Sequence, residues 1–232
     1  MPLKEILPCD LCGRIARVRE IIAQAERRHG RPTGGVTVVA ASKAQPIPRI
    51  RAAAECGLHL FGENYVQEAE PKIIALRELC WHFIGPLQAN KTRKVAKLFD
   101  WVHSIDRLKI AVRLSAQRPE LDTPLDVCLQ VNISREPAKS GVLIENLPKL
   151  AEQVASLAHL RLRGLMAIPA PSTEAAAQRR AFAAMRMALE DLNCRGHRLD
   201  TLSMGMSGDL EAAIAEGATM VRVGTAIFGP RV

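Results

Sequence analysis

The chain has 232 residues, of which 48% are hydrophobic, and it carries a formal net charge of +8 at pH 7. This length is enough to bury a sizeable core, as in one α/β barrel or two small domains. No apolar run reaches the length of a transmembrane helix, and the N-terminus lacks the apolar middle and cleavage site of a signal peptide. The composition therefore predicts a cytoplasmic protein without membrane spans.

The positive charge is concentrated in residues 88–99, where Lys91, Arg93, Lys94 and Lys97 fall on one predicted helix. Two interpretations are open, a surface for nucleic acid and a solvated helix face. Aromatic residues make up only 3% of the chain and no zinc-finger or RNP-type motif is present, so stacking platforms are scarce. We favour the solvated face and predict no specific nucleic-acid partner.

Six cysteines are spread through the sequence, and Cys9 and Cys12 form a CxxC pair. Neither a second pair nor a nearby histidine completes a zinc set, so we predict no metal site. A redox or metal role for the pair stays open, but we expect reduced thiols near a frayed terminus.

The first predicted element is an amphipathic helix over about residues 12–29. From residue 36 onward, short apolar runs alternate with helical patterns of roughly ten to eighteen residues. The predicted strands are 36–42, 59–63, 81–85, 101–105, 126–132, 160–167, 201–205 and 220–224. The helical patterns are "IPRIRAAAECG", "VQEAEPKIIALRELC", "QANKTRKVAKLF", "RLKIAVRLSAQ", "IENLPKLAEQVASL", "TEAAAQRRAFAAMRMALEDL" and "DLEAAIAEG".

Eight strands that alternate with helices predict a single (β/α)8 TIM barrel over residues 1–232, with an extra N-terminal helix at its bottom or side. A doubly wound open sheet is the main rival. That fold normally carries a glycine-rich dinucleotide fingerprint after its first strand, and "ASKAQP" has no glycine. No linker or low-complexity tract splits the chain, so one domain is expected.

Lys43 directly follows the first predicted strand, and active sites of such barrels gather at the C-terminal ends of the strands. An ammonium held over an apolar core is poorly solvated, which lowers its pKa and exposes a nucleophilic amine. Such an amine forms Schiff bases with aldehydes and ketones. For Lys43 taken alone, a side chain that extends into water is the alternative interpretation.

The last predicted strand strengthens the functional interpretation. Its alternation places Arg222 on one face and Val221 and Val223 on the other. Because the valines suit the layer of surrounding helices, we predict that Arg222 points inward, where its permanent charge needs a partner from protein or ligand. The structural alternative is an internal salt bridge with Glu63 or Asp106.

Small-residue turns follow the last two predicted strands. In "GMSGDLEAA", Ser207 occupies a position suited to a helix N-cap, and after the last strand Gly224 and Thr225 offer N–H groups and a hydroxyl. Barrels often bind phosphate at these two places. A reactive amine, an inward guanidinium and two phosphate-sized turns together describe pyridoxal 5′-phosphate (PLP).

Several motifs closely resemble the pyridoxal phosphate homeostasis protein family, whose members look like the N-terminal barrel of alanine racemase standing alone. The match covers about residues 36–229 and includes "ASK", "FGENYVQE", "WHFIGPLQANK", "NIS…KSG", "RGLMAIP", "GMSGD" and "MVRVGTAIFG". The resemblance implies that PLP forms a Schiff base on Lys43, with Asn64 nearby. It places the phosphate at Ser207, Gly224 and Thr225.

The same resemblance implies that Arg222 faces the pyridine nitrogen. A permanent cation there disfavours protonation of that nitrogen and weakens the ring as an electron sink. The remaining members of the predicted cofactor-binding set are Ile84, Met166, Met204, Gly205 and Met206. Filling the top of the barrel is the alternative role of the three methionines.

Two departures from a working racemase argue against robust catalysis. The chain lacks the racemase domain whose tyrosine supplies the second proton-transfer group, and its own Tyr65 lies beside Asn64. Met166 stands where the racemase barrel presents a histidine to the ring. The family is regarded as acting in vitamin B6 and amino-acid homeostasis, so we predict a PLP-binding protein that is not an enzyme.

Other assignments remain open at this stage. A low-activity PLP-dependent amino-acid racemase or lyase is the alternative function, and an anion-binding barrel is a third. Other B6 vitamers, amino acids and PLP-requiring apo-enzymes are candidate partners, and a monomer is expected. His82 suits either the pocket or a structural role, and Lys139, in a loop, is the second candidate for the Schiff base.

Overall fold

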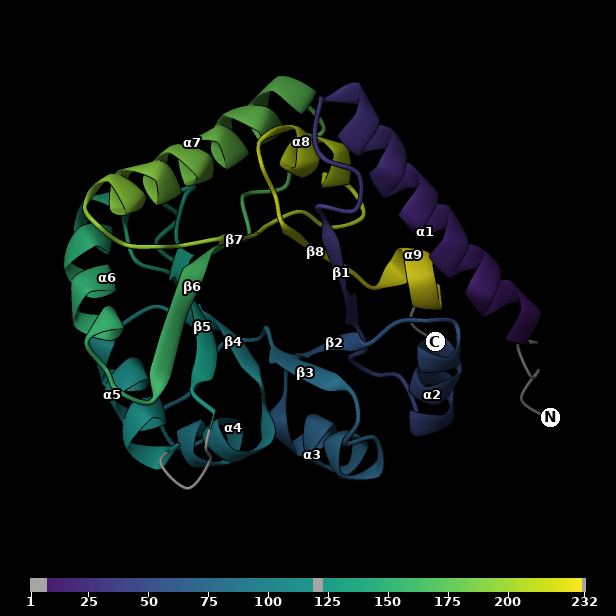
Figure 1. Ribbon diagram of the computed structural model, residues 1–232, viewed down its shortest axis with the longest axis horizontal. Coiled ribbons are helices and arrows are strands. Elements are labelled where there is room, and N and C mark those ends of the chain that lie inside the picture. The colour runs from purple at the N-terminus through teal and green to yellow at the C-terminus, as the bar shows by residue number, and fades with distance from the viewer. Residues whose placement is uncertain (1–7, 119–122, 231–232) are drawn as a thin grey trace.

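The structure of the protein is a computed structural model that describes residues 8–118 and 123–230. Eight parallel strands form a closed barrel in sequence order, with helices around it (Figure 1). The strands are β1 (Thr37–Ala41), β2 (Leu60–Glu63), β3 (Cys80–Phe83), β4 (Trp101–Ile105), β5 (Leu125–Val131), β6 (Leu160–Ala167), β7 (Thr201–Ser203) and β8 (Met220–Val223). The helices are α1 (Pro8–Arg28), α2 (Ile47–Glu55), α3 (Val66–Ala75), α4 (Thr92–Leu98), α5 (Leu108–Gln117), the 3-10 turn η1 (Ile144–Asn146), α6 (Leu147–Ala155), α7 (Ala175–Cys194), α8 (Leu210–Ala215) and α9 (Thr225–Phe228).

The pairing of β8 with β1 closes the sheet, with Thr37 opposite Met220 and Val39 opposite Arg222. This closure confirms the predicted (β/α)8 TIM barrel and excludes the doubly wound open sheet. The strands form where the sequence has short apolar runs, because a parallel strand in a barrel is covered on both faces. The register shifts between β4 and β5 and between β5 and β6, so the strand pairing on that side of the barrel is irregular.

Helix α1 is the predicted additional helix. Its buried face is formed by Leu11, Ile15, Val18, Ile22 and Ala25, a spacing that repeats every three or four residues. This face packs on α2, α8 and α9, so α1 covers the side of the barrel near β8 and β1 (Figure 1). Of the two expected positions, side and bottom, the structure has the side.

The prediction for the cysteine pair is wrong in part. Cys12 forms a disulfide with Cys56, at a Cα–Cα distance of 5.3 Å, because α1 packs on α2 and brings the two residues together. A sequence separation of 44 residues hides this contact from the one-dimensional pattern. The side chain of Cys9 lies outside the described residues.

The buried residues form two layers. The larger one fills the space between the sheet and the helices and includes Val102, Val127 and Leu165. Residues one position away on the same strands, Cys128 and Met166, point to the opposite face and pack with Trp101 inside the barrel. The shell of helices therefore rests on apolar contacts, and the barrel interior is a separate environment.

Within the described ranges, no helix combines the length and apolar character that a membrane crossing requires. Helix α4 carries Arg93, Lys94 and Lys97, and Lys91 is its N-cap residue. Val95 and Ala96 are buried and Arg93 is exposed. Lys94 Nζ lies 2.6 Å from Glu70 Oε2 on α3. This is the arrangement of a helix with one solvated, ion-paired face.

Candidate functional site

A cavity of about 310 Å³ opens at the C-terminal ends of the strands. We call it the rim cavity. Its lining consists of Ala41, Lys43, Gln45, Asn64, Ile84, Ile168, Met206, Ser207, Gly208, Arg222, Gly224, Thr225, Phe228 and Gly229. The two predicted key residues, Lys43 and Arg222, therefore open into the same space.

Eight of the eleven predicted cofactor-binding residues line the rim cavity, namely Lys43, Asn64, Ile84, Met206, Ser207, Arg222, Gly224 and Thr225. Three do not. Met166 and Met204 are fully buried, and Met166 packs with Trp101 and Cys128 inside the barrel. Gly205 adopts a φ of 96°, and a Cβ there would stand 2.6 Å from Ala213 Cβ. These three residues therefore lie outside the lining of the rim cavity.

Lys43 is half-buried just after β1, in a turn that a buried polar cluster holds. We call Glu63, Glu68 and Lys72 the Lys72 cluster. Lys72 Nζ donates to Ser42 O at 3.0 Å, to Glu63 Oε1 at 2.8 Å and to Glu68 Oε1 at 2.6 Å. Ser42 Oγ donates to Glu63 Oε1 at 2.6 Å. The residue before Lys43 is thereby fixed through both its carbonyl and its hydroxyl.

The residue after Lys43 is fixed by the same cluster. Ala44 has a φ of 61°, a left-handed conformation that is uncommon for a residue with a Cβ. Its N–H donates to Glu68 Oε1. The Lys72 cluster therefore grips the chain on both sides of Lys43 and sets the direction in which its side chain leaves the backbone.

Asn64 and Ile84 enter the cavity from the ends of β2 and β3. The N–H of Ile84 donates to Glu63 O at 2.9 Å, which continues the strand pairing by one residue. Next to Ile84 a Cβ on Gly85 would stand 2.3 Å from Asn64 O, so only glycine permits this approach.

Arg222 points inward from β8, as predicted. Its Nη1 donates to Ser203 O at 2.6 Å and to Ser203 Oγ at 2.7 Å, and its Nη2 donates to Ala167 O at 2.9 Å. These acceptors are neutral, and burial lowers the pKa of the guanidinium to about 10. Among the described residues no carboxylate forms an ion pair with it, because Glu63 pairs with Lys72 and Asp106 with Arg107. The salt-bridge interpretation of Arg222 is therefore wrong.

Behind Arg222, a chain of hydrogen bonds crosses the barrel interior. His103 Nδ1 lies 2.7 Å from Ser203 Oγ, and His103 Nε2 lies 2.8 Å from His82 Nδ1. Because the guanidinium only donates, Ser203 Oγ accepts from it and its own proton is available to His103 Nδ1. We call Arg222, Ser203, His103 and His82 the interior chain.

Both histidines of the interior chain are neutral. Burial lowers the pKa of His82 to about 3, and burial, His82 and Arg222 together hold the pKa of His103 well below its usual value. His82 stacks on Trp101 at a ring distance of 5.3 Å and does not line the rim cavity. Of its two predicted roles, the structural one is observed.

The turns after β7 and β8 reach the rim cavity with small residues. Ser207 is exposed and is not the N-cap of α8, because Asp209 occupies that position. Asp209 Oδ1 instead accepts the N–H of Met206 at 2.6 Å and holds the turn. Gly224 is the N-cap residue of α9, and Thr225 begins that helix. Two hydroxyl-bearing turns therefore flank one side of the cavity.

Sequence reasoning missed six lining residues, Ala41, Gln45, Ile168, Gly208, Phe228 and Gly229. Each lies within four residues of a predicted member along the chain. Reading every residue of the "ASKAQ", "MAIP", "GMSGD" and "TAIFG" segments, not one position after each strand, would have included them. The described residues contain no group of three potential metal ligands.

Comparison with known proteins identifies the family of the chain. Residues 15–232 match the model of the family described as alanine racemase, N-terminal domain. The pyridoxal phosphate homeostasis protein of Pseudomonas aeruginosa is 58% identical over 219 residues, 94% of either chain. That of Escherichia coli K12 is 52% identical over 227 residues, covering 96% of this chain and 97% of the relative.

A solved structure of PipY from Synechococcus elongatus PCC7942, described with PLP bound, is 38% identical. It superimposes with a TM-score of 0.84 and covers 94% of this chain and 100% of PipY. The family match, over residues 15–232, spans every segment that lines the rim cavity. The chain therefore belongs to the alanine racemase N-terminal domain family and, within it, to the pyridoxal phosphate homeostasis proteins.

Proposed function

We propose that this protein binds PLP in the rim cavity as a Schiff base on Lys43 and acts in vitamin B6 and amino-acid homeostasis without robust catalysis. The observation that carries the proposal is the shared opening of Lys43 and Arg222 into one cavity flanked by two hydroxyl-bearing turns. The names of the relatives and the PLP described in PipY support the same ligand.

The donor set of the rim cavity fits the three ends of PLP. Lys43 supplies an amine for the aldehyde, Ser207 and Thr225 supply hydroxyls for the phosphate, and Arg222 supplies a fixed cation for the pyridine nitrogen. When bound, PLP withdraws electrons from a carbon attached through its imine. Arg222 limits this effect, because a guanidinium held by three neutral acceptors disfavours a proton on the facing nitrogen.

The lining also supports weak catalysis at most. Lys43 and Arg222 are the titratable residues among the described residues of the rim cavity, and no tyrosine, histidine or carboxylate joins them. Racemisation requires a second proton-transfer group opposite the lysine. Tyr65 is 63% exposed and lies outside the cavity lining. A binding role therefore suits the lining better than turnover.

Borohydride reduction followed by peptide mapping tests the proposal. We expect a yellow protein in which reduction fixes PLP onto the peptide that contains Lys43, and a Lys43→Ala variant that loses this adduct. Lys139→Ala serves as the matched control, because Lys139 is the second candidate for the Schiff base, and it should keep the adduct on Lys43. Full covalent loading of the Lys43→Ala protein at another lysine would contradict the assignment.

The alternative function is a low-activity racemase or lyase, which the family relationship to alanine racemase keeps in view. Incubation with alanine or serine enantiomers in deuterated water separates the two. Exchange of the Cα hydrogen at a useful turnover, abolished by Lys43→Ala, would favour an enzyme. We expect no such exchange.

The proposal includes a cytoplasmic location and transfer of PLP to apo-enzymes, with other B6 vitamers and amino acids as further ligands. The Cys12–Cys56 disulfide is unusual for a cytoplasmic protein, because reducing compartments disfavour disulfides. Salt-sensitive retention of RNA by protein that holds no PLP would support an anion-binding barrel instead and would remove the proposal.

A further inference from the structure

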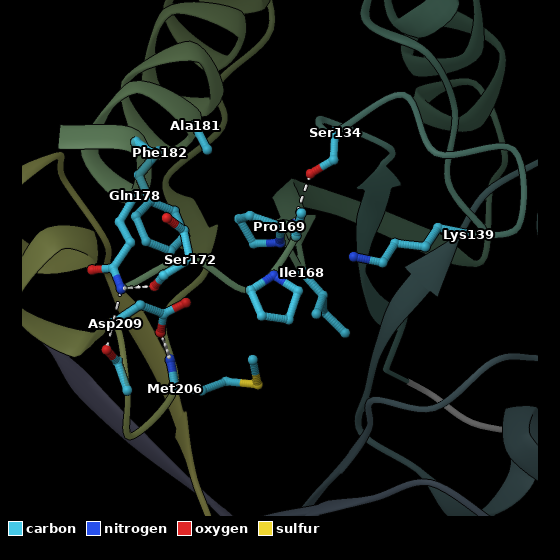
Figure 2. Close-up of a pocket in the computed structure, with 14 residues that line it drawn as sticks. Ser134, Lys139, Ile168, Pro169, Ser172, Gln178, Ala181, Phe182, Met206 and Asp209 are labelled. Atoms are coloured by element: carbon cyan, nitrogen blue, oxygen red, sulfur yellow. Dashed lines mark hydrogen bonds between the residues drawn. The ribbon is translucent and has the colours of Figure 1, made fainter. Parts of the chain in front are cut away.

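A second cavity, of about 540 Å³, lies beside the rim cavity. We call it the lateral pocket. It lies among the segments that follow β5, β6 and β7 and the first half of α7 (Figure 2). Its volume is in the range of small-molecule sites, and it sits at the barrel face where ligands of this fold bind.

The lateral pocket adjoins the rim cavity. Ile168, Met206 and Gly208 line both spaces. Ile168 is 39% exposed and Met206 is 38% exposed, so two large apolar side chains face solvent at the junction of the cavities. Both side chains are therefore accessible to a ligand in the lateral pocket.

The walls of the pocket are apolar and fixed. Pro169 and Pro171 restrict the backbone on one side, and Phe182 is fully buried behind the other. The N–H of Ala170 donates to Ser134 Oγ at 2.8 Å, which ties the proline segment to the loop after β5. A pocket held in this way needs little rearrangement to accept a ligand.

The two charged residues that line the pocket are Lys139 and Asp209. Figure 2 shows Lys139 reaching in from one side toward Ile168, with Asp209 on the other side. Asp209 Oδ1 already accepts the N–H of Met206 at 2.6 Å. Lys139 Nζ lies 2.7 Å from Glu136 Oε1, and because an ammonium has three N–H donors, this pair leaves donors for a ligand.

We propose that the lateral pocket binds a small carboxylate with an apolar chain. The carboxylate lies at Lys139, and the chain lies against Ile168, Pro169 and Ala181. Fatty acids, 2-oxo acids and amino acids with aliphatic side chains share this chemistry. The inference goes beyond PLP binding at Lys43, because neither Lys43 nor Arg222 lines the lateral pocket. For amino acids it rests on the proposed function, which includes them as ligands.

Calorimetric titration of the full chain as purified, without removal of PLP, tests the inference with 4-methylpentanoate and its neutral amide, 4-methylpentanamide. We expect saturable binding of the carboxylate, and binding of the amide about tenfold weaker, because a charge-assisted hydrogen bond is lost. Leucine and 4-methyl-2-oxopentanoate, titrated in parallel, show whether an amine or a keto group improves the fit.

Variants locate the binding. Lys139→Met keeps the side-chain stem and should weaken the carboxylate about tenfold while it leaves the amide unchanged. Ala181→Trp places a large ring in the pocket from α7 and should abolish binding of both probes. Ala176→Trp, on the exposed face of the same helix, is the matched control and should bind as the unaltered protein does.

Two results would overturn the inference. One is the absence of saturable binding of every carboxylate up to about 10 mM. The other is carboxylate binding that survives both Lys139→Met and Ala181→Trp, which would place the ligand elsewhere. Peptide mapping of Lys43 on the same preparation shows separately whether the proposed function holds.

Discussion

Inside the barrel, buried side chains from β3, β4, β7 and β8 form a hydrogen-bonded chain, whereas the layer between strands and helices is almost wholly apolar. His82, His103 and Ser203 are fully buried, as are Phe61 and Ile110 in the outer layer. The two regions exclude water to the same degree. They differ in the interactions that their buried side chains make, which are apolar contacts in the outer layer and hydrogen bonds in the barrel interior.

The outer layer gains free energy from the apolar area that it removes from water. The interior chain gains little in this way, since each polar group gives up hydrogen bonds to water for those inside. What it provides is position, because it gives the permanent charge of Arg222 neutral acceptors and a fixed direction toward the rim cavity. Equal burial thus serves stability in one region and the ligand site in the other.

The largest effect is expected from the outer layer. Phe61→Ala removes a fully buried ring that packs 5.7 Å from the ring of Trp81, and it should lower the free energy of unfolding by about 3–5 kcal/mol. Tyr65→Ala removes a side chain that is 63% exposed and should change it by less than about 0.5 kcal/mol. Urea unfolding measures both. Equal losses for the two variants would remove the contrast between layer and surface.

The next largest effect concerns the Lys72 cluster, which lies in the outer layer near Lys43. Lys72→Met leaves the carboxylate of Glu63 buried with only Ser42 as donor, and it should cost about 3 kcal/mol at pH 8. Burial raises the pKa of Glu63, and Lys72 opposes that rise. In the variant the pKa rises further, so the destabilisation is present above that pKa and is relieved as the pH falls toward 5.

Urea unfolding at pH 8 and pH 5 measures this effect, and PLP loading of Lys43 gives a second reading because Lys72 holds the Lys43 turn. The double variant Lys72→Met with Glu63→Gln should recover much of the loss, since it removes the buried charge. Lys149→Met, at an exposed position on α6, is the control. A loss that is the same at both pH values would show that Glu63 stays ionised without Lys72.

The fold was predictable because most strands are short apolar runs bounded by polar or small residues. The run 36–42 becomes Thr37–Ala41, and the run 220–224 becomes Met220–Val223. Strand alternation likewise placed Arg222 inside and its valine neighbours outside. These features depend on local sequence and on the closure that a (β/α)8 pattern requires.

The rest depends on contacts between segments far apart in sequence. Nothing in the pattern pairs Lys72 with Ser42, Cys12 with Cys56, or His103 with Ser203, which are 100 residues apart. Met166 shows the same limit, because a strand end predicts a position near the rim but not which side chains reach it. Periodicity gives the face of a strand, and only the closed barrel gives the neighbour across it.

The smallest of the three effects concerns the interior chain and is measured as the change in the free energy of unfolding with pH. Burial lowers the pKa of His82 to about 3, and the pKa of His103 is also lowered. The pKa of a histidine in the unfolded state is about 6.5. Between those values the unfolded state binds more protons than the folded state. The contribution of the two histidines to the free energy of unfolding is therefore fully present above about pH 6.5. It falls as the pH drops, by up to about 1.4 kcal/mol per pH unit for each histidine.

His82→Asn removes one of these two titrations and keeps an amide near the place of the imidazole Nδ1 that faces His103. Urea unfolding between pH 7 and pH 5 should show a slope reduced by about 1.4 kcal/mol per unit relative to the unaltered protein. His59→Asn, at an exposed histidine one residue before β2, should leave the slope unchanged. If His82→Asn also left it unchanged, His82 would not be held neutral by burial, and the contrast between the interior chain and solvent-exposed histidines would fail.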